Sequence, residues 1–113
     1  MTQPPDQQDE MYKRLISISR QAFADQEYEV AYHTLVATMY RAMQLKSALL
    51  LLREVLEEAA DQQKTLDTLA PEHRISTFTA RRHGHQSVYG ALQNQLVTRI
   101  QLLETEPLCG KRE

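Results

Sequence analysis

Apolar residues recur at helical spacing along most of the chain, and the longest such run extends from Tyr28 to Leu69 without a glycine or a proline. Intervals of three and four residues place side chains on one side of a helix, so both halves of the run predict amphipathic helix. The apolar stripe consists of Tyr28, Tyr32, Leu35, Met39 and Ala42 in the first half and of Leu45, Leu49, Leu52, Leu56, Ala59 and Leu66 in the second.

The stripe slips around the helix between Ala42 and Leu45, where two intervals of three residues follow each other. An unbroken helix over the whole run would be roughly 60 Å long, whereas a compact domain of this size is roughly 35 Å across. We therefore expect the chain to reverse between about Met43 and Ser47. The alternative is a continuous helix whose excess length is buried against a second copy of the protein.

Four consecutive leucines, at positions 49–52, cannot all lie on one stripe, because successive residues are about 100° apart around a helix. Leu50 and Leu51 are expected to point away from the main apolar face. A helix with a second apolar surface is either the central element of a bundle or part of an interface. Leu50 and Leu51 are therefore the candidate interface residues.

A further helical pattern precedes the run. It predicts a first helix from about Gln8 to Ala24, and a two-residue link leads to the second helix, from Glu27 to about Met43. The third helix then extends from about Lys46 to Leu69. The residues expected on the buried side of the first helix are Met11, Leu15, Ile18 and Ala22, with Tyr12, Ile16 and Phe23 widening the stripe.

A short fourth helix is expected after Pro71, which ends the third helix and can begin the next. Proline is tolerated at the first position of a helix but not inside one. Ile75 and Phe78 would share the core-facing side of this helix, and Gly84 is placed to cap its C-terminus.

The last helix begins after Ser87, a candidate N-cap, and is expected to continue until Glu106 and Pro107 stop it. No stretch alternates apolar and polar residues in the way a strand would. The sequence therefore predicts an all-α fold of four to five helices, arranged as an antiparallel helical bundle or a helical-hairpin array with no sheet.

The helices on either side of the expected reversal carry a partial repeat pattern, made of Tyr32, Leu35, Val36 and Met39 followed by Ala48 and Leu52. These residues resemble a tetratricopeptide-type helical hairpin, whose pattern is W-x2-L-G-x2-Y followed by A-x3-F. Val36 and Met39 differ from the glycine and the tyrosine of that family. A second registration makes Tyr28, Ala31 and Leu35 the second helix of an earlier repeat. The resemblance implies a surface that binds a peptide or a partner protein and carries no chemistry of its own.

The length of 113 residues, the net charge of −2 and the 42% of hydrophobic residues are those of one globular domain. We expect a helical domain over 8–106, a disordered segment over 1–7 and a flexible tail over 107–113. The single cysteine, Cys109, has no internal partner, which favours a reducing compartment. Neither a signal peptide nor an apolar run of about 20 residues is present, so a cytoplasmic location without membrane contact is expected.

Arginine and histidine gather between positions 73 and 85. If these side chains converge, they would bind phosphate or an acidic partner, because guanidinium groups make paired, charge-assisted hydrogen bonds to anions. Alternatively, they form a solvated helix end whose cations match the helix dipole. Nucleic acid is the less favoured ligand, since base stacking needs an exposed ring and Phe78 is expected in the core. The candidate residues are Arg74, Arg81, Arg82, His83 and His85.

The histidines do not have the spacing of a metal site. His83, His85 and His73 offer three imidazoles, but structural zinc sites usually add cysteines at tight spacing. The helices also lack the paired Glu-x-x-His motifs of carboxylate-bridged metal bundles. No nucleophile or acid–base set is evident, so no metal, cofactor or catalytic residue is predicted.

The patterns favour a small helical protein-interaction or regulatory module that self-associates as a homo-oligomer or binds a partner protein. Its contact surface would be the leucine-rich third helix with Leu50 and Leu51. The alternative hypothesis is an anion-, phosphate- or nucleic-acid-binding protein that uses the arginine and histidine cluster at 73–85.

Overall fold

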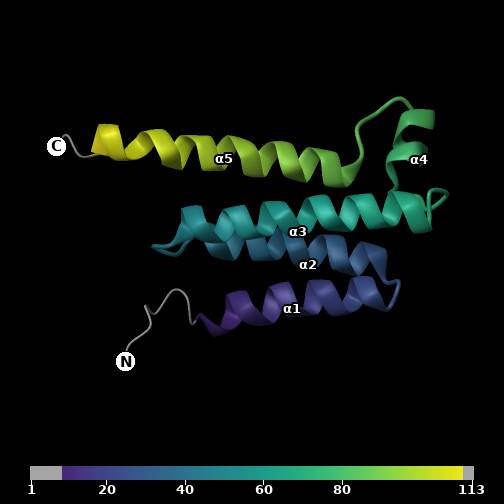
Figure 1. The fold of residues 1–113 in the computed structure, drawn as a ribbon, viewed down its shortest axis with the longest axis horizontal. Helices are drawn as coiled ribbons and strands as arrows, with labels where there is room; N and C mark the ends of the chain where they lie inside the picture. The colour runs from purple at the N-terminus through teal and green to yellow at the C-terminus, as the bar shows by residue number, and fades with distance from the viewer. Residues whose placement is uncertain (1–8, 111–113) are drawn as a thin grey trace.

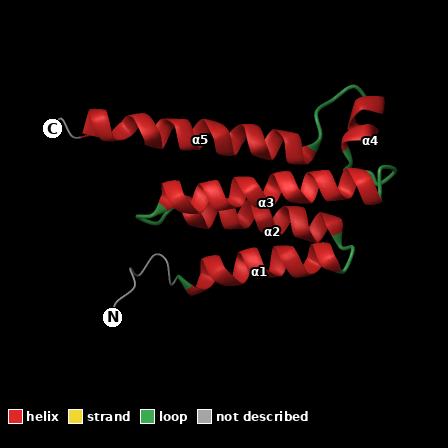
Figure 2. Ribbon diagram, viewed as in Figure 1, coloured by secondary structure: helices red, strands yellow, loops and turns green. Residues whose placement is uncertain are grey.

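The chain forms a helical bundle. The computed structural model describes the backbone of residues 9–110 and the side chains of residues 9–105. Within that part there is no strand, which confirms the expected all-α fold, and the chain reverses at residues 44–47, as expected (Figures 1 and 2). The helices are α1 (Glu10–Ala24), α2 (Tyr28–Met43), α3 (Ala48–Leu69), α4 (Thr77–Arg82) and α5 (Val88–Gly110).

The four long helices run alternately up and down in a flat arrangement. Figure 1 shows α2 and α3 together at the centre, with α1 along one side and α5 along the other. The Cα atoms extend over 50 × 31 × 16 Å, and their radius of gyration of 15.5 Å exceeds the value of about 13 Å for a compact domain of this length. The two outer helices therefore each leave a long side uncovered.

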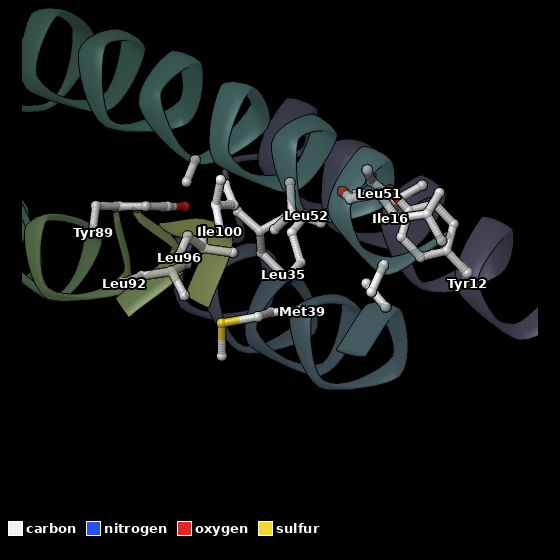
Figure 3. Packing of buried hydrophobic residues seen from close by; sticks show 14 of the residues in the cluster. Tyr12, Ile16, Leu35, Met39, Leu51, Leu52, Tyr89, Leu92, Leu96 and Ile100 are labelled. Carbon is white, nitrogen blue, oxygen red and sulfur yellow. Dashed lines mark hydrogen bonds between the residues drawn. The ribbon is translucent and has the colours of Figure 1, made fainter. Parts of the chain in front are cut away.

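The core lies between the central pair and the two outer helices (Figure 3). Both predicted stripes of the central run contribute to it, with Leu35 and Met39 of α2 and Leu52 of α3 fully buried. From α5, Tyr89 and Leu96 are also fully buried against this pair. Strong periodicity without glycine or proline thus identified the central hairpin correctly.

Helix α1 buries only part of the expected stripe, in which Ala22 and two of the three widening residues are buried and two other members are exposed. Tyr12, Ile16 and Ser19 are buried, whereas Met11 and Ile18 are 55% and 49% exposed. The reason is that α1 lies against both central helices, and the Ser19 hydroxyl on its inner side donates a hydrogen bond of 2.7 Å to the carbonyl of Ala31. A hydroxyl with such a partner replaces an apolar residue at the buried position.

A buried chain of hydrogen bonds connects all four long helices. The Tyr89 hydroxyl of α5 donates to Gln62 Oε1 of α3 over 2.5 Å, and Gln62 Nε2 donates to Ser19 Oγ of α1 over 3.0 Å. Ser19 in turn donates to α2 through the carbonyl of Ala31. Because every member has a partner, this network fixes the relative position of the helices without leaving an unsatisfied polar group.

Helix α4 begins later than Pro71, contrary to expectation. Residues 71–76 form turns, and the helix is N-capped by Ser76, whose Oγ accepts from the Thr79 amide over 3.1 Å. Asp67 of α3 accepts from the Thr77 amide over 2.8 Å. These two acceptors satisfy backbone donors at Thr77 and Thr79 and so fix the start of the helix.

Two helices end in the same way. In each, the second residue past the cap donates five residues back, from the Glu27 amide to the Ala22 carbonyl after α1 and from the His85 amide to the Ala80 carbonyl after α4. This is the Schellman arrangement, which places one residue in the left-handed region. That residue is Gly84 with φ of 75° after α4, as predicted, but Gln26 with φ of 66° after α1.

The start of helix α5 agrees with the prediction, but its end does not. Ser87 is its N-cap, since Ser87 Oγ accepts from the Gly90 amide over 2.9 Å, which confirms the expected start. The expected stop at Glu106 and Pro107 is wrong, because the helix continues to Gly110. Proline fixes φ near the helical value, so it can be accommodated at the loss of one backbone bond. Residues 1–7, expected to be disordered, and 111–113 of the expected tail lie outside the described residues.

Candidate functional site

The adjacent leucines of α3 have different environments. Leu51 is 6% exposed and packs under α1, where its carbonyl accepts a weak hydrogen bond from the Tyr12 hydroxyl over 3.4 Å. Leu50 is 56% exposed. Of the two alternatives for this second apolar surface, Leu51 fits the central position in a bundle, because α1 covers that side of α3. Only Leu50 of the pair remains available to a partner.

Leu50 borders a groove between α1 and α3, and this groove is the candidate functional site. Its volume is about 540 Å³. Buried Tyr12, Ile16 and Leu51 supply an apolar floor, and longer polar side chains stand at the rim. The lining consists of Tyr12, Lys13, Ile16, Ser17 and Arg20 of α1 and of Leu50, Leu51 and Glu54 of α3.

Charged side chains close the groove at one end. Arg20 of α1 donates from Nε to Glu58 over 2.9 Å, and its Nη2 lies 3.6 Å from Glu54. Hydrogen bonding to Glu58 raises the pKa of the Arg20 guanidinium above its ordinary value. The Tyr12 hydroxyl donates to Glu54 Oε1 over 2.6 Å. Burial, reinforced by this hydrogen bond, raises the pKa of Tyr12, so the phenol remains a donor at neutral pH.

Unpaired charges of opposite sign lie at the rim of the groove and beside it. On α1, Lys13 stands at the rim and has no ion-pair partner among the side chains of residues 9–105. On α3, exposed Glu57 lies on the same side as Leu50, seven residues further on, and likewise has no such partner in that range. The surface therefore combines an apolar floor with one unpaired cation and one unpaired carboxylate.

The arginine and histidine cluster does not converge on one point. Arg74 forms an ion pair with Glu29 of α2, and Arg82 lies 3.9 Å from Glu72. Arg81 is exposed and makes no ion pair with a described side chain. The rings of His83 and His85 stack with centroids 6.2 Å apart. Arg81, which lies beside Arg82 at the end of α4, is therefore the arginine of the cluster without an ion-pair partner among the described side chains.

Phe78 is exposed rather than buried, which corrects the expectation that it belongs to the core. Its exposed fraction is 48%, and the Arg82 guanidinium carbon lies 5.7 Å from the centre of its ring. The short helix α4 begins at Thr77, so it turns Phe78 outward while Ala80 is buried. An exposed ring beside a guanidinium is a surface on which a planar group can stack.

His73 is separated from the other two histidines. Its ring packs edge-on against Tyr28 with centroids 5.2 Å apart, and its Nδ1 accepts from the Ile75 amide over 3.2 Å. Across the described residues, no three side chains of the metal-binding types lie close enough together to hold an ion.

Sequence reasoning identified Leu50 but missed the groove. Tyr12 and Leu51 are 39 residues apart in the sequence and belong to different helices, so no local pattern shows that they meet. The available signal was the doubled apolar pattern of the first helix, where Tyr12 and Ile16 follow Met11 and Leu15 by one residue. That pattern allows two buried sides, and the partner helices decide between them.

Comparison with known proteins adds no relative. No protein family, no curated protein and no solved structure matches this chain. Among the described helices, none is both long enough and apolar enough to cross a membrane.

Proposed function

We propose that the protein is a small helical interaction module that self-associates through the α1–α3 groove. The observation that carries this proposal is Leu50, a 56% exposed leucine at the rim of a groove with an apolar floor. An apolar side chain beside an apolar depression is the arrangement in which two surfaces of the same kind can bury one another. The tetratricopeptide resemblance stays a prediction and is consistent with a binding role.

The favoured occupant of the groove is a second copy of the chain, because the surface is complementary to itself. In a twofold interface each patch meets the same patch of the other copy, so α1 of one copy faces α3 of the other. Lys13 then lies opposite Glu57 of the second copy, and the reverse pair forms by symmetry. Both groups lack an ion-pair partner among the described side chains of a single chain.

Sedimentation equilibrium over a range of protein concentrations tests the proposal. We expect a monomer–dimer equilibrium that Leu50→Glu weakens at least tenfold, since it places a charge in an apolar contact. Leu69→Glu is the matched control, because Leu69 lies on the same helix with 69% exposure and outside the groove. A wild-type protein that remains monomeric at millimolar concentration contradicts self-association.

Charge reversal tests the assigned pairing. Lys13→Glu and Glu57→Lys should each weaken the dimer, and the double variant should restore most of the lost affinity because it exchanges the partners of one ion pair. Weakening by the single variants without restoration by the double variant would place the contact elsewhere on the surface.

A second candidate function is anion binding at the end of α4, which the exposure of Phe78 beside Arg82 favours. A phosphate would pair with Arg81 and Arg82, and a base or another planar group would stack on Phe78. Binding of a fluorescent single-stranded oligonucleotide should weaken steeply with salt and be lost in an Arg81→Ala, Arg82→Ala variant. Equal retention of the variant and the wild type on heparin would exclude this function.

A cytoplasmic location is part of the proposal. It is supported by the single cysteine, Cys109, which leaves no pair for an internal disulfide. Fractionation of cells that express the tagged protein would test it.

A further inference from the structure

Helix α5 carries one charged residue in an otherwise uncharged stretch. Between Val88 and Leu103, Arg99 is the sole acidic or basic side chain. Arg99 is partly buried, and its Nε atom is buried without a hydrogen-bond partner among the described residues. Buried polar atoms in folded proteins almost always have a partner, so an exception of this kind requires an explanation.

Three other arginines of the described region show what Arg99 lacks. Arg20, Arg41 and Arg53 each lie within 3.0 Å of a carboxylate oxygen of another helix or of the segment before α1. Arg99 makes no ion pair with any described side chain. A buried guanidinium N–H group without an acceptor destabilises a fold, whereas a carboxylate ligand would compensate for that loss.

Two hollows adjoin Arg99. One, of about 250 Å³, lies where α2, α3 and α5 meet, and Leu102 at its edge is 61% exposed. Apart from Arg99 its wall is entirely apolar. The second, of about 370 Å³, lies along α5, and most of its lining residues carry a polar group. The first is lined by Met43, Leu52, Arg99, Leu102 and Leu103, and the second by Asn94, Gln95, Thr98, Arg99 and Leu102.

We infer that Arg99 and these two hollows form a binding site for a carboxylate that ends a short apolar chain. The guanidinium group presents its N–H groups as a fork that matches the two oxygens of a carboxylate. Met43, Leu52 and Leu103 receive the apolar chain, while Asn94, Gln95 and Thr98 lie on the polar side of the same arginine. The apolar hollow is smaller than a typical site for a drug-sized ligand, which limits the ligand to a small carboxylic acid or the end of a peptide.

The same chemistry is offered by a free monocarboxylic acid and by the C-terminus of a hydrophobic peptide. Both place a carboxylate next to apolar carbon atoms. The site lies on α5, across the central helices from α1 and the α1–α3 groove (Figure 1). Its occupancy is therefore independent of self-association through that groove, and each proposal can fail without the other.

Titration of the full chain with octanoate, followed by calorimetry, tests the inference. We expect saturable binding that Arg99→Gln weakens at least tenfold, since a hydrogen bond between charged groups contributes about 1.5–3 kcal/mol. Octan-1-ol, which lacks the charge, should bind at least tenfold more weakly. Arg81→Gln is the control, because Arg81 is exposed and lines neither hollow. A tri-leucine peptide with a free or an amidated C-terminus distinguishes the two sources of the carboxylate.

The inference is overturned if neither octanoate nor the free peptide binds saturably, or if Arg99→Gln binds them as tightly as the wild type. A second measurement is independent of binding. Arg99→Met removes the buried unpaired group, so its thermal midpoint without ligand should equal or exceed that of the wild type. A clear fall in the midpoint would show that Arg99 is already compensated in the free protein and would remove the premise of the inference.

Discussion

The hydroxyl of Tyr89 donates a hydrogen bond of 2.5 Å to the side-chain oxygen of Gln62, and both residues are buried at the interface of α5 with α3. The Gln62 amide nitrogen donates to Ser19 Oγ over 3.0 Å and to Glu58 Oε2 over 2.9 Å. One amide group therefore satisfies polar atoms on three helices.

Loss of this amide should destabilise the fold. Gln62→Leu leaves the Tyr89 hydroxyl buried without its acceptor, and we expect the free energy of unfolding to fall by about 1–3 kcal/mol. Tyr89→Phe alone should cost about 1 kcal/mol, and the double variant should cost less than the sum because both changes remove the same bond. Urea unfolding followed by circular dichroism measures all three. Gln101→Leu, an exposed change on α5, should stay within about 0.5 kcal/mol.

Helices α1 and α4 end in the same kind of turn, with a residue in the left-handed region. Substitutions at these two residues should change the stability of the fold in opposite directions. Gln26→Gly relieves a side chain at φ of 66°, and we expect the free energy of unfolding to rise by up to about 1 kcal/mol. Gly84→Gln places a side chain at φ of 75°, where a loss of about 1 kcal/mol is expected. No atom lies within 4 Å of a Cβ added at Gly84, so backbone conformation alone sets that loss. Equal effects of the same sign would contradict this reading of the two turns.

Stability should fall in alkaline solution. Burial raises the pKa of both Tyr12 and Tyr89 above the ordinary value of about 10, so the folded state keeps protons that the unfolded state releases. Their contribution is complete below about pH 10 and is lost as pH rises, by up to about 1.4 kcal/mol per pH unit for each group. The slope of unfolding free energy against pH, measured between about pH 9 and 11, should be shallower in a Tyr12→Phe, Tyr89→Phe variant. An unchanged slope would assign the alkaline loss to other groups.

The adjacent leucines of α3 should differ in their contribution to stability. Leu51→Ala removes a buried side chain and is expected to cost about 2–4 kcal/mol, whereas Leu50→Ala should change the free energy of unfolding by less than about 0.5 kcal/mol. Chemical unfolding at a concentration where the protein is monomeric measures the difference. A large cost at Leu50 under those conditions would mean that Leu50 is covered within a single chain.

The central hairpin could be predicted from the sequence because its periodicity is strong and uninterrupted. The slip of the stripe between Ala42 and Leu45 marked the reversal, which the structure places at residues 44–47. Helix α1 could not be oriented in the same way. Its apolar residues lie on two neighbouring sides, and the choice between them depends on bonds from Tyr12 to Glu54 and from Ser19 to Ala31. Those contacts exist only once the helices are assembled.

The start of α4 and both candidate sites have the same limitation. Asp67 fixes the start of α4 from ten residues away, so the proline rule alone placed it too early. The α1–α3 groove and the hollow beside Arg99 each combine side chains of distant helices. The sequence contains the members of these sites, but their proximity follows from tertiary packing.

The flat order of helices also affects how the chain assembles. Helix α1 packs on α2, α2 on α3 and α3 on α5, so each long helix meets a neighbour that immediately precedes it or is separated from it by only a short element. Little chain must be closed into loops before contacts form, and proteins of such low contact order fold within microseconds to milliseconds. During synthesis, each new helix can dock on one that has already emerged, and α5 completes the domain last.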